Sequence, residues 1–172
     1  MDLECRDIYF RLLHNKLSTR ERLFVYKKAK NPYCLKESVS RILFGPLEYG
    51  VRSFENLIVG GATDDVLHTF CACRKVSYLW RWMRGTVLRF LPARWSSLSN
   101  QEILYLMWPC LEHDQTVVWL LSQYTQYVWT HGRDSMADFK LDPFIGYLES
   151  RYVAHVTSNR LPLSDIVVFD PG

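Results

Sequence analysis

The sequence predicts an all-α fold, a compact bundle of roughly six to eight helices. Several segments repeat apolar residues at three- and four-residue spacing, which is typical of amphipathic helices. Most of these segments follow a serine, threonine or aspartate that could cap a helix. The strand-like patch IVVF, at 166–169, has no obvious second strand with which to pair. With 172 residues, 48% of them hydrophobic, the chain is long enough for one domain with a substantial core.

The first helices are expected over 4–16 and from the capping-box pattern at Ser18 and Glu21 to about Lys30. Ile8, Leu12 and Leu13 form the apolar stripe of the first helix. Asn31-Pro32 should end the second helix, and a further helix is expected over 35–44. Four glycines and a proline follow between positions 45 and 61, so we interpret 36–62 as an insertion rich in loops.

The longest helix is predicted over 75–91, interrupted but not ended by Gly85. Trp80 falls on its apolar stripe, whereas Tyr78 and Trp82 fall off it and are predicted to be available for stacking. The remaining helices are expected from the caps at Thr63-Asp64-Asp65, from the Ser99–Glu102 capping box to Pro109, from Asp114 to Gly132, and from Asp142-Pro143 to about Thr157.

Charge is unevenly distributed along the chain. Residues 1–94 contain 17 Lys or Arg against 9 Asp or Glu, and residues 95–172 contain 4 against 9. We therefore divide the chain into a basic helical region at 1–94, an acidic helical region at 95–160 packed on it as one globule, and an extended tail at 161–172. The opposite charges could attract each other within the globule, or the basic region could present a surface to phosphates.

Several classes of protein do not fit the composition. The sequence contains no apolar run long enough for a membrane span, and MDLECRD lacks the pattern of a secretion signal, so we expect an intracellular protein, cytoplasmic or nuclear. Five unevenly spaced cysteines do not predict a disulfide framework. The acids are scattered, and no glycine-rich phosphate loop or nucleophile elbow is present. We expect no catalytic residues, no enzymatic activity and no small-molecule substrate.

The stretch HTFCAC, at 68–73, places a histidine and two cysteines close together. These residue types are the preferred ligands of structural zinc. A free cysteine also packs like a small apolar residue, so Cys71 and Cys73 could equally fill the core. The six residues alone leave both interpretations open.

The order of motifs resembles the zinc-binding domain near the C-terminus of LINE-type (non-LTR retrotransposon) reverse transcriptases. The residues that carry the resemblance are LSTRERL at 17–23, Asn31-Pro-Tyr-Cys34, Asp65-Val-Leu-His68, Cys73 after four intervening residues, and Trp80. The resemblance implies a zinc-binding, non-enzymatic module that binds nucleic acid, because the family's catalytic carboxylates lie in other domains. The chain would be a stand-alone or domesticated descendant.

The sequence departs from the family pattern at the metal site. Glu37 stands where the family has its second cysteine, and about thirty residues separate Cys34 from His68, where the family has about ten. By the resemblance, Cys34, His68 and Cys73 are candidate ligands, with Cys71 or Glu37 as the fourth. Both a zinc-bound domain and a metal-free descendant stay open, and the missing cysteine favours the metal-free one.

Two functions follow. The first is binding of RNA or DNA by the basic region, as family descent implies. The second is a protein–protein adaptor that has lost zinc and nucleic-acid binding and docks a partner through exposed aromatics and the IVVF tail. The insertion and the acidic region favour the second. The candidate nucleic-acid-binding residues are Arg20, Arg22, Lys27, Lys28, Lys30, Arg74, Lys75, Arg81, Arg84 and Arg89.

Overall fold

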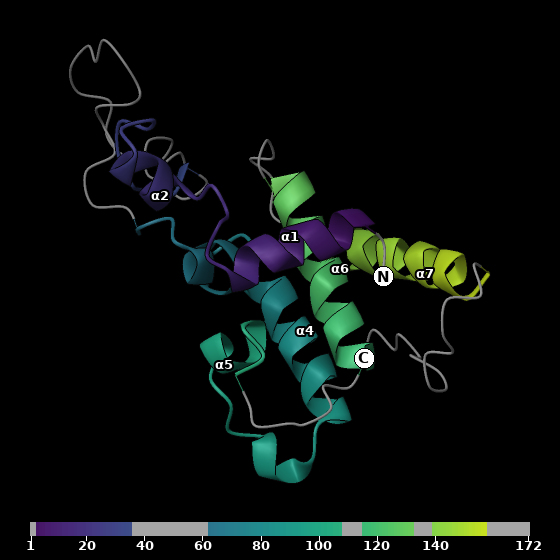
Figure 1. Ribbon diagram of the computed structural model, residues 1–172. Coiled ribbons are helices and arrows are strands. Elements are labelled where there is room, and N and C mark those ends of the chain that lie inside the picture. The colour runs from purple at the N-terminus through teal and green to yellow at the C-terminus, as the bar shows by residue number, and fades with distance from the viewer. Residues whose placement is uncertain (1–2, 36–61, 108–114, 133–138, 158–172) are drawn as a thin grey trace, which may run out of the picture.

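The computed structural model describes residues 3–35, 62–107, 115–132 and 139–157, and their regular structure is helical (Figure 1). Within these ranges, the one β-type pairing is an isolated bridge between Tyr33 and Thr63. The elements are α1 (Leu3–Leu13), α2 (Arg20–Val25), the π-helix η2 (His68–Ala72), α4 (Ser77–Phe90), the 3-10 helix η3 (Ala93–Trp95), α5 (Asn100–Leu104), α6 (Gln115–Gly132) and α7 (Leu141–Thr157). The predicted all-α fold is confirmed. Among the described helices, none combines the length and apolar character that crossing a membrane requires.

Helix α6 is the centre of the bundle. In Figure 1, α1 crosses it and α4 runs beside it, and both pack against it. Aromatic pairs join α6 to α7, including Trp119 with Tyr152 and Tyr124 with Phe144. Nearly every residue of α6 from Thr116 to Val128 is buried, so this helix is covered on all sides rather than on one stripe.

Burial on all sides requires partners for the polar side chains of α6. The hydroxyls of Ser122 and Thr125 donate to the carbonyls of Trp119 and Ser122 on their own helix. The Gln123 side-chain carbonyl accepts a hydrogen bond from the Tyr147 hydroxyl on α7. These bonds offset the loss of water around the buried polar groups.

Helix α4 matches the helix predicted over 75–91 and continues through Gly85. Trp80 is buried as expected, with its ring 5.4 Å from that of Tyr124. The expectation that Trp82 is available for stacking is wrong. Trp82 is half-buried and meets the ring of Phe144 edge-on at 5.9 Å, because α7 covers the side of α4 that the sequence left without a neighbour.

Helix α2 is shorter than predicted, and its cap differs. The Thr19 side chain, not Ser18, accepts the hydrogen bond from the Arg22 amide, so the expected Ser18–Glu21 capping box is absent. The helix ends at Val25 instead of continuing to Lys30. Lys27 adopts the left-handed conformation there, with φ of 56°, and helical hydrogen bonding cannot continue through it.

Helix α5 begins with the predicted capping box, in which Ser99 and Glu102 bond each other's backbone amides. It ends at Leu104 rather than near Pro109, because Leu106 is also left-handed, with φ of 54°. Helices α6 and α7 match their predicted ranges. The Asp114 cap, the insertion from Lys36 to Gly61, nearly all of the helix expected over 35–44, and the tail at 161–172 lie outside the described residues.

Candidate functional site

Three side chains that are distant in sequence form a buried cluster of metal-ligand type. The ligating atoms of Cys34, His68 and Cys73 all lie within 4.8 Å of one another. The two Sγ atoms are 3.9 Å apart. Two thiols and an imidazole are thus brought together by the fold, as the resemblance implied for these three residues.

The short bridge beside Cys34 fixes one side of the cluster. The Cys34 amide donates to the Ala62 carbonyl at 2.9 Å, and the Asp64 amide donates to the Pro32 carbonyl at 2.9 Å. This antiparallel pairing holds the chain after α2 against the segment that leads into η2. It therefore places Cys34 beside His68, despite the insertion between them.

The π-helix η2 aligns the other two members. In an α-helix, residues five apart point about 140° away from each other. In η2 the Cys73 amide instead bonds the His68 carbonyl at 2.8 Å, five residues back. This wider turn brings His68 and Cys73 close to vertical alignment, so their side chains share one face. A π-turn in place of an α-turn is thus the local feature that places both His68 and Cys73 in the cluster.

Two consecutive aspartates support η2, and sequence analysis assigned both only to a helix start. Asp65 does have that role, because its carboxylate accepts from the His68 amide at 2.6 Å. Asp64 has a different role, because it joins two helices. Its carboxylate accepts from the Thr69 hydroxyl at 2.9 Å and from the Arg20 amide at the start of α2. The two adjacent acids were the only sequence feature that pointed to these roles. The sequence could not show that Asp65 caps η2 whereas Asp64 joins η2 to α2.

The chemistry of the cluster fits a zinc ion. With Zn–S bonds of about 2.3 Å, two thiolates in a tetrahedral site lie about 3.8 Å apart, close to the observed Sγ separation of 3.9 Å. The hydrogen bond with Cys73, together with burial, raises the pKa of the Cys34 thiol, while the neighbouring His68 side chain acts to lower it. Without a metal the thiol is therefore neutral, and an ion would displace its proton. These described residues could provide three of the four ligands that structural zinc takes.

Of the two candidates for the fourth ligand, Cys71 does not join this group. Cys71 lies outside the group of three ligating atoms although it is equally buried. Burial, followed by the nearby Asp65 carboxylate, raises the pKa of the Cys71 thiol. Cys71 occupies the core position that an apolar residue would take. Glu37 lies outside the described residues.

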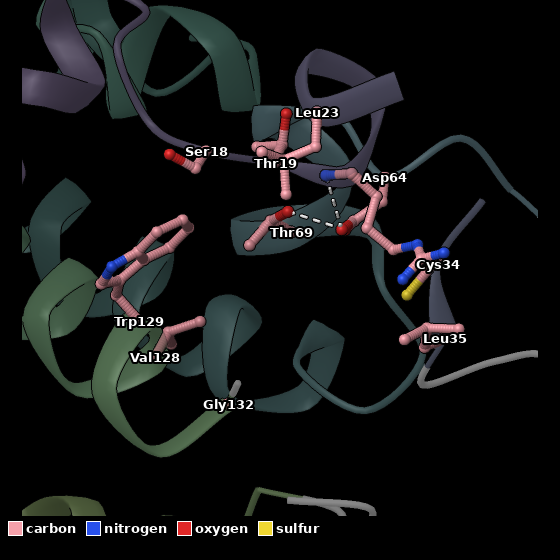
Figure 2. Close-up of a pocket in the computed structure, with 11 residues that line it drawn as sticks. Ser18, Thr19, Leu23, Cys34, Leu35, Asp64, Thr69, Val128, Trp129 and Gly132 are labelled. Carbon is pink, nitrogen blue, oxygen red and sulfur yellow. Dashed lines mark hydrogen bonds between the residues drawn. The ribbon is translucent and has the colours of Figure 1, made fainter. Parts of the chain in front are cut away.

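A pocket of about 210 Å³ opens beside Cys34 (Figure 2). Figure 2 shows Val128 and Trp129 of α6 on one side of it, and Asp64, Cys34 and Leu35 on the other. The hydrogen bonds of Asp64 to Thr69 and to the start of α2 lie along its wall. The Asp64 carboxylate in the wall is thus used to join segments of the fold.

The predicted nucleic-acid-binding residues separate into two groups by exposure. Lys27, Lys28, Lys30, Arg74, Arg81 and Arg89 are exposed, whereas Arg20, Arg22, Lys75 and Arg84 are half-buried. Arg84 donates to the Leu98 carbonyl at 2.7 Å and so ties α4 to the turn before α5. Arg20 donates to the Asn31 side chain. Among the described residues these two side chains have structural contacts that compete with ligand binding.

Comparison with protein-family models, curated proteins and solved structures gave no match to this chain. The resemblance to a retrotransposon zinc-binding domain therefore depends on the motif residues alone. It stays a prediction.

Proposed function

We propose that this chain is a non-enzymatic nucleic-acid-binding module, descended from a retrotransposon reverse transcriptase domain, in which a buried zinc site stabilises the fold. One observation carries the proposal. Arg74, Tyr78, Arg81, Gly85 and Arg89 follow one another at spacings of four, three, four and four residues, and all are exposed. Residues at this spacing lie on one face of α4 and the turn before it.

The composition around this α4 face supports binding to a polyanion. Between Asp65 and Glu102 the sequence has six Lys or Arg residues and no Asp or Glu. The guanidinium of Arg81 lies over the Tyr78 ring, 5.9 Å from its centroid, which orders both side chains at the surface. Positive charge without neighbouring acids along a helix attracts phosphates and is screened by salt.

Zinc would stabilise the base of this face rather than take part in chemistry. Cys34 follows α2, and Cys73 directly precedes Arg74. An ion held by Cys34, His68 and Cys73 would therefore tie α2 to the start of the α4 face. Structural zinc contributes its binding free energy to folding.

Salt-dependent binding tests the proposal. We expect a labelled single-stranded RNA to bind at low salt, with affinity falling tenfold or more between roughly 50 and 200 mM salt. Arg81→Glu should weaken binding at least fivefold, because it reverses a charge on the α4 face. Lys140→Glu changes the net charge equally at an exposed site next to α7 and should have less than a twofold effect. Absence of binding at low salt, or equal losses in both variants, would reject the proposal.

The exposed apolar side chains of α2 favour one competing function, a protein adaptor. A pull-down from source cells, with nuclease added to half of the sample, separates the two. Partners lost after nuclease support nucleic-acid binding. Partners that persist, combined with no binding to RNA at low salt, support the adaptor.

A further inference from the structure

The C-terminal end of helix α2 presents apolar side chains to solvent. None of its residues is buried. Phe24, Val25 and, at the C-cap, Tyr26 are 45%, 69% and 58% exposed. Contiguous exposed apolar surface is a common feature of binding sites.

Three cations and two acids lie next to these apolar residues. The Arg22 guanidinium lies 5.7 Å from the centroid of the Tyr26 ring and is 3.5 Å from its hydroxyl, to which it donates. Lys27 and Lys28 follow directly and are exposed. Glu21 is the one acid within α2, and Asp65 lines a pocket together with Arg22, Val25 and Tyr26. The α2 surface, defined as Phe24, Val25 and Tyr26 with these three cations, therefore combines two aromatic rings with a small excess of positive charge. Because residues two positions apart in a helix point about 160° away from each other, the two rings lie on either side of Val25.

We propose that the α2 surface binds single-stranded nucleic acid, with bases stacking on Phe24 and Tyr26 and phosphates meeting Arg22, Lys27 and Lys28. This inference rests on the proposed function and names its ligand more closely. Aromatic side chains beside cations are the features that hold single strands, because every base has a flat face on which to stack. In a duplex those faces are already stacked on one another, so exposed rings gain little. The positive charge disfavours a neutral or basic protein partner.

The left-handed backbone at Lys27 allows a substitution that removes a charge without destabilising the fold. The Lys28 amide bonds the Leu23 carbonyl at 2.8 Å, and the Lys27 amide bonds the Phe24 carbonyl at 2.9 Å. This is a Schellman end, and its left-handed position, here Lys27 with φ of 56°, usually holds glycine. Lys27→Gly should therefore raise the melting temperature while removing one phosphate contact.

A matched backbone control is available at the end of α1. Asn15 is left-handed, with φ of 49°, in the same type of turn, where the Lys16 amide bonds the Arg11 carbonyl. Asn15→Gly relieves the backbone without changing charge. It should leave affinity for the single strand within twofold of the wild-type value.

The experiment measures affinities for a labelled single-stranded RNA and for its duplex by fluorescence anisotropy. We expect the single strand to bind about tenfold more tightly than the duplex, and Phe24→Ala with Tyr26→Ala to remove most of that preference. Lys27→Gly should weaken binding severalfold and lower the slope of log affinity against log salt by about one. Phe10→Ala, which removes another half-exposed ring with a cation over it, should change neither affinity. Circular dichroism checks that each variant is folded.

Each remaining outcome identifies which proposal fails. Equal affinity for single strand and duplex, unaffected by the α2 variants, overturns the α2 surface as a stacking site and leaves salt-dependent nucleic-acid binding intact. No binding of either form at low salt overturns the proposed function and this inference together. A loss of self-association in the Phe24 and Tyr26 variants, without any change in RNA affinity, assigns the surface to a second copy of the chain and rejects RNA.

Discussion

At the scale of single residues, the two cysteines of HTFCAC have different environments although they are two positions apart. Cys73 shares a face with His68 through the π-turn and lies 3.9 Å from the sulfur of Cys34. Cys71 lies outside this group and is buried in the core. Of the two cysteines in HTFCAC, Cys73 thus belongs to the metal-ligand cluster and Cys71 does not.

Replacing each cysteine by alanine tests this difference with equal loss of side-chain volume. We expect protein purified without added zinc to contain about one equivalent, falling below about 0.2 in Cys73→Ala and staying near one in Cys71→Ala. Both variants should lose stability, because both remove buried atoms. Metal content by mass spectrometry and melting with a chelator measure the two effects. Wild-type protein with less than about 0.2 equivalents and unchanged melting in chelator would leave the cluster a packing feature.

At the scale of elements, helix ends decide the boundaries that sequence analysis missed. Helices α1, α2 and α5 each stop at a left-handed residue other than glycine, namely Asn15, Lys27 and Leu106. Glycine is the usual signal for such an end. Without it, the pattern predicted helices running to Lys30 and Pro109. Glycine does occur inside α4, where the helix continues.

That glycine gives a prediction for α4. A Cβ added at Gly85 would meet no atom within 4 Å, and the position is exposed. Gly85→Ala should therefore stabilise the protein by about 0.5–1 kcal/mol, because alanine restricts the unfolded chain and favours the helix. Urea unfolding measures the change. Unchanged or lower stability would mean that the helix is not retained in solution at this point.

The capping box of α5 predicts a dependence on pH. Hydrogen bonds from Ser99, first from its side chain and then from its backbone, lower the pKa of Glu102. A carboxylate with a lowered folded pKa stabilises the fold above its unfolded pKa, and this contribution disappears as pH falls through the folded value. Glu102→Gln should therefore be less stable than wild type at pH 7, with the difference shrinking below about pH 4. Urea unfolding at both pH values checks this, and a constant difference would contradict it.

At the scale of the whole molecule, α6 organises the bundle because α1, α4 and α7 all pack on it. The two tryptophans of α4 pack against different helices of the bundle. Trp80 contacts Tyr124 of α6, and Trp82 contacts Phe144 of α7. One is fully within the core and the other is at its margin.

Alanine at each position should separate these contributions. Trp80→Ala should lower the free energy of unfolding by roughly 3–5 kcal/mol, because it leaves a cavity against α6. Trp82→Ala should lower it by roughly half as much, since its ring is already partly in water. Chemical denaturation with fluorescence detection compares them. Equal losses would mean that α7 encloses α4 more completely than the half-buried ring at position 82 indicates.

The resemblance to a zinc-binding domain named the three members of the metal-ligand cluster. The sequence by itself determined the all-α class, most helix starts and the buried stripe of α4. Each of these depends on local spacing, on capping residues or on side-chain chemistry, which a linear pattern contains. Only the tertiary structure decided that Asp64 joins α2 to η2, that α7 half-covers Trp82, and that Arg84 is tied to Leu98 while Arg81 faces solvent. The separation of Cys71 from Cys73 and the exposure of α2 belong to the same group. These features depend on which segments meet across long sequence separations, and on a π-turn and left-handed helix ends that no glycine or proline announces.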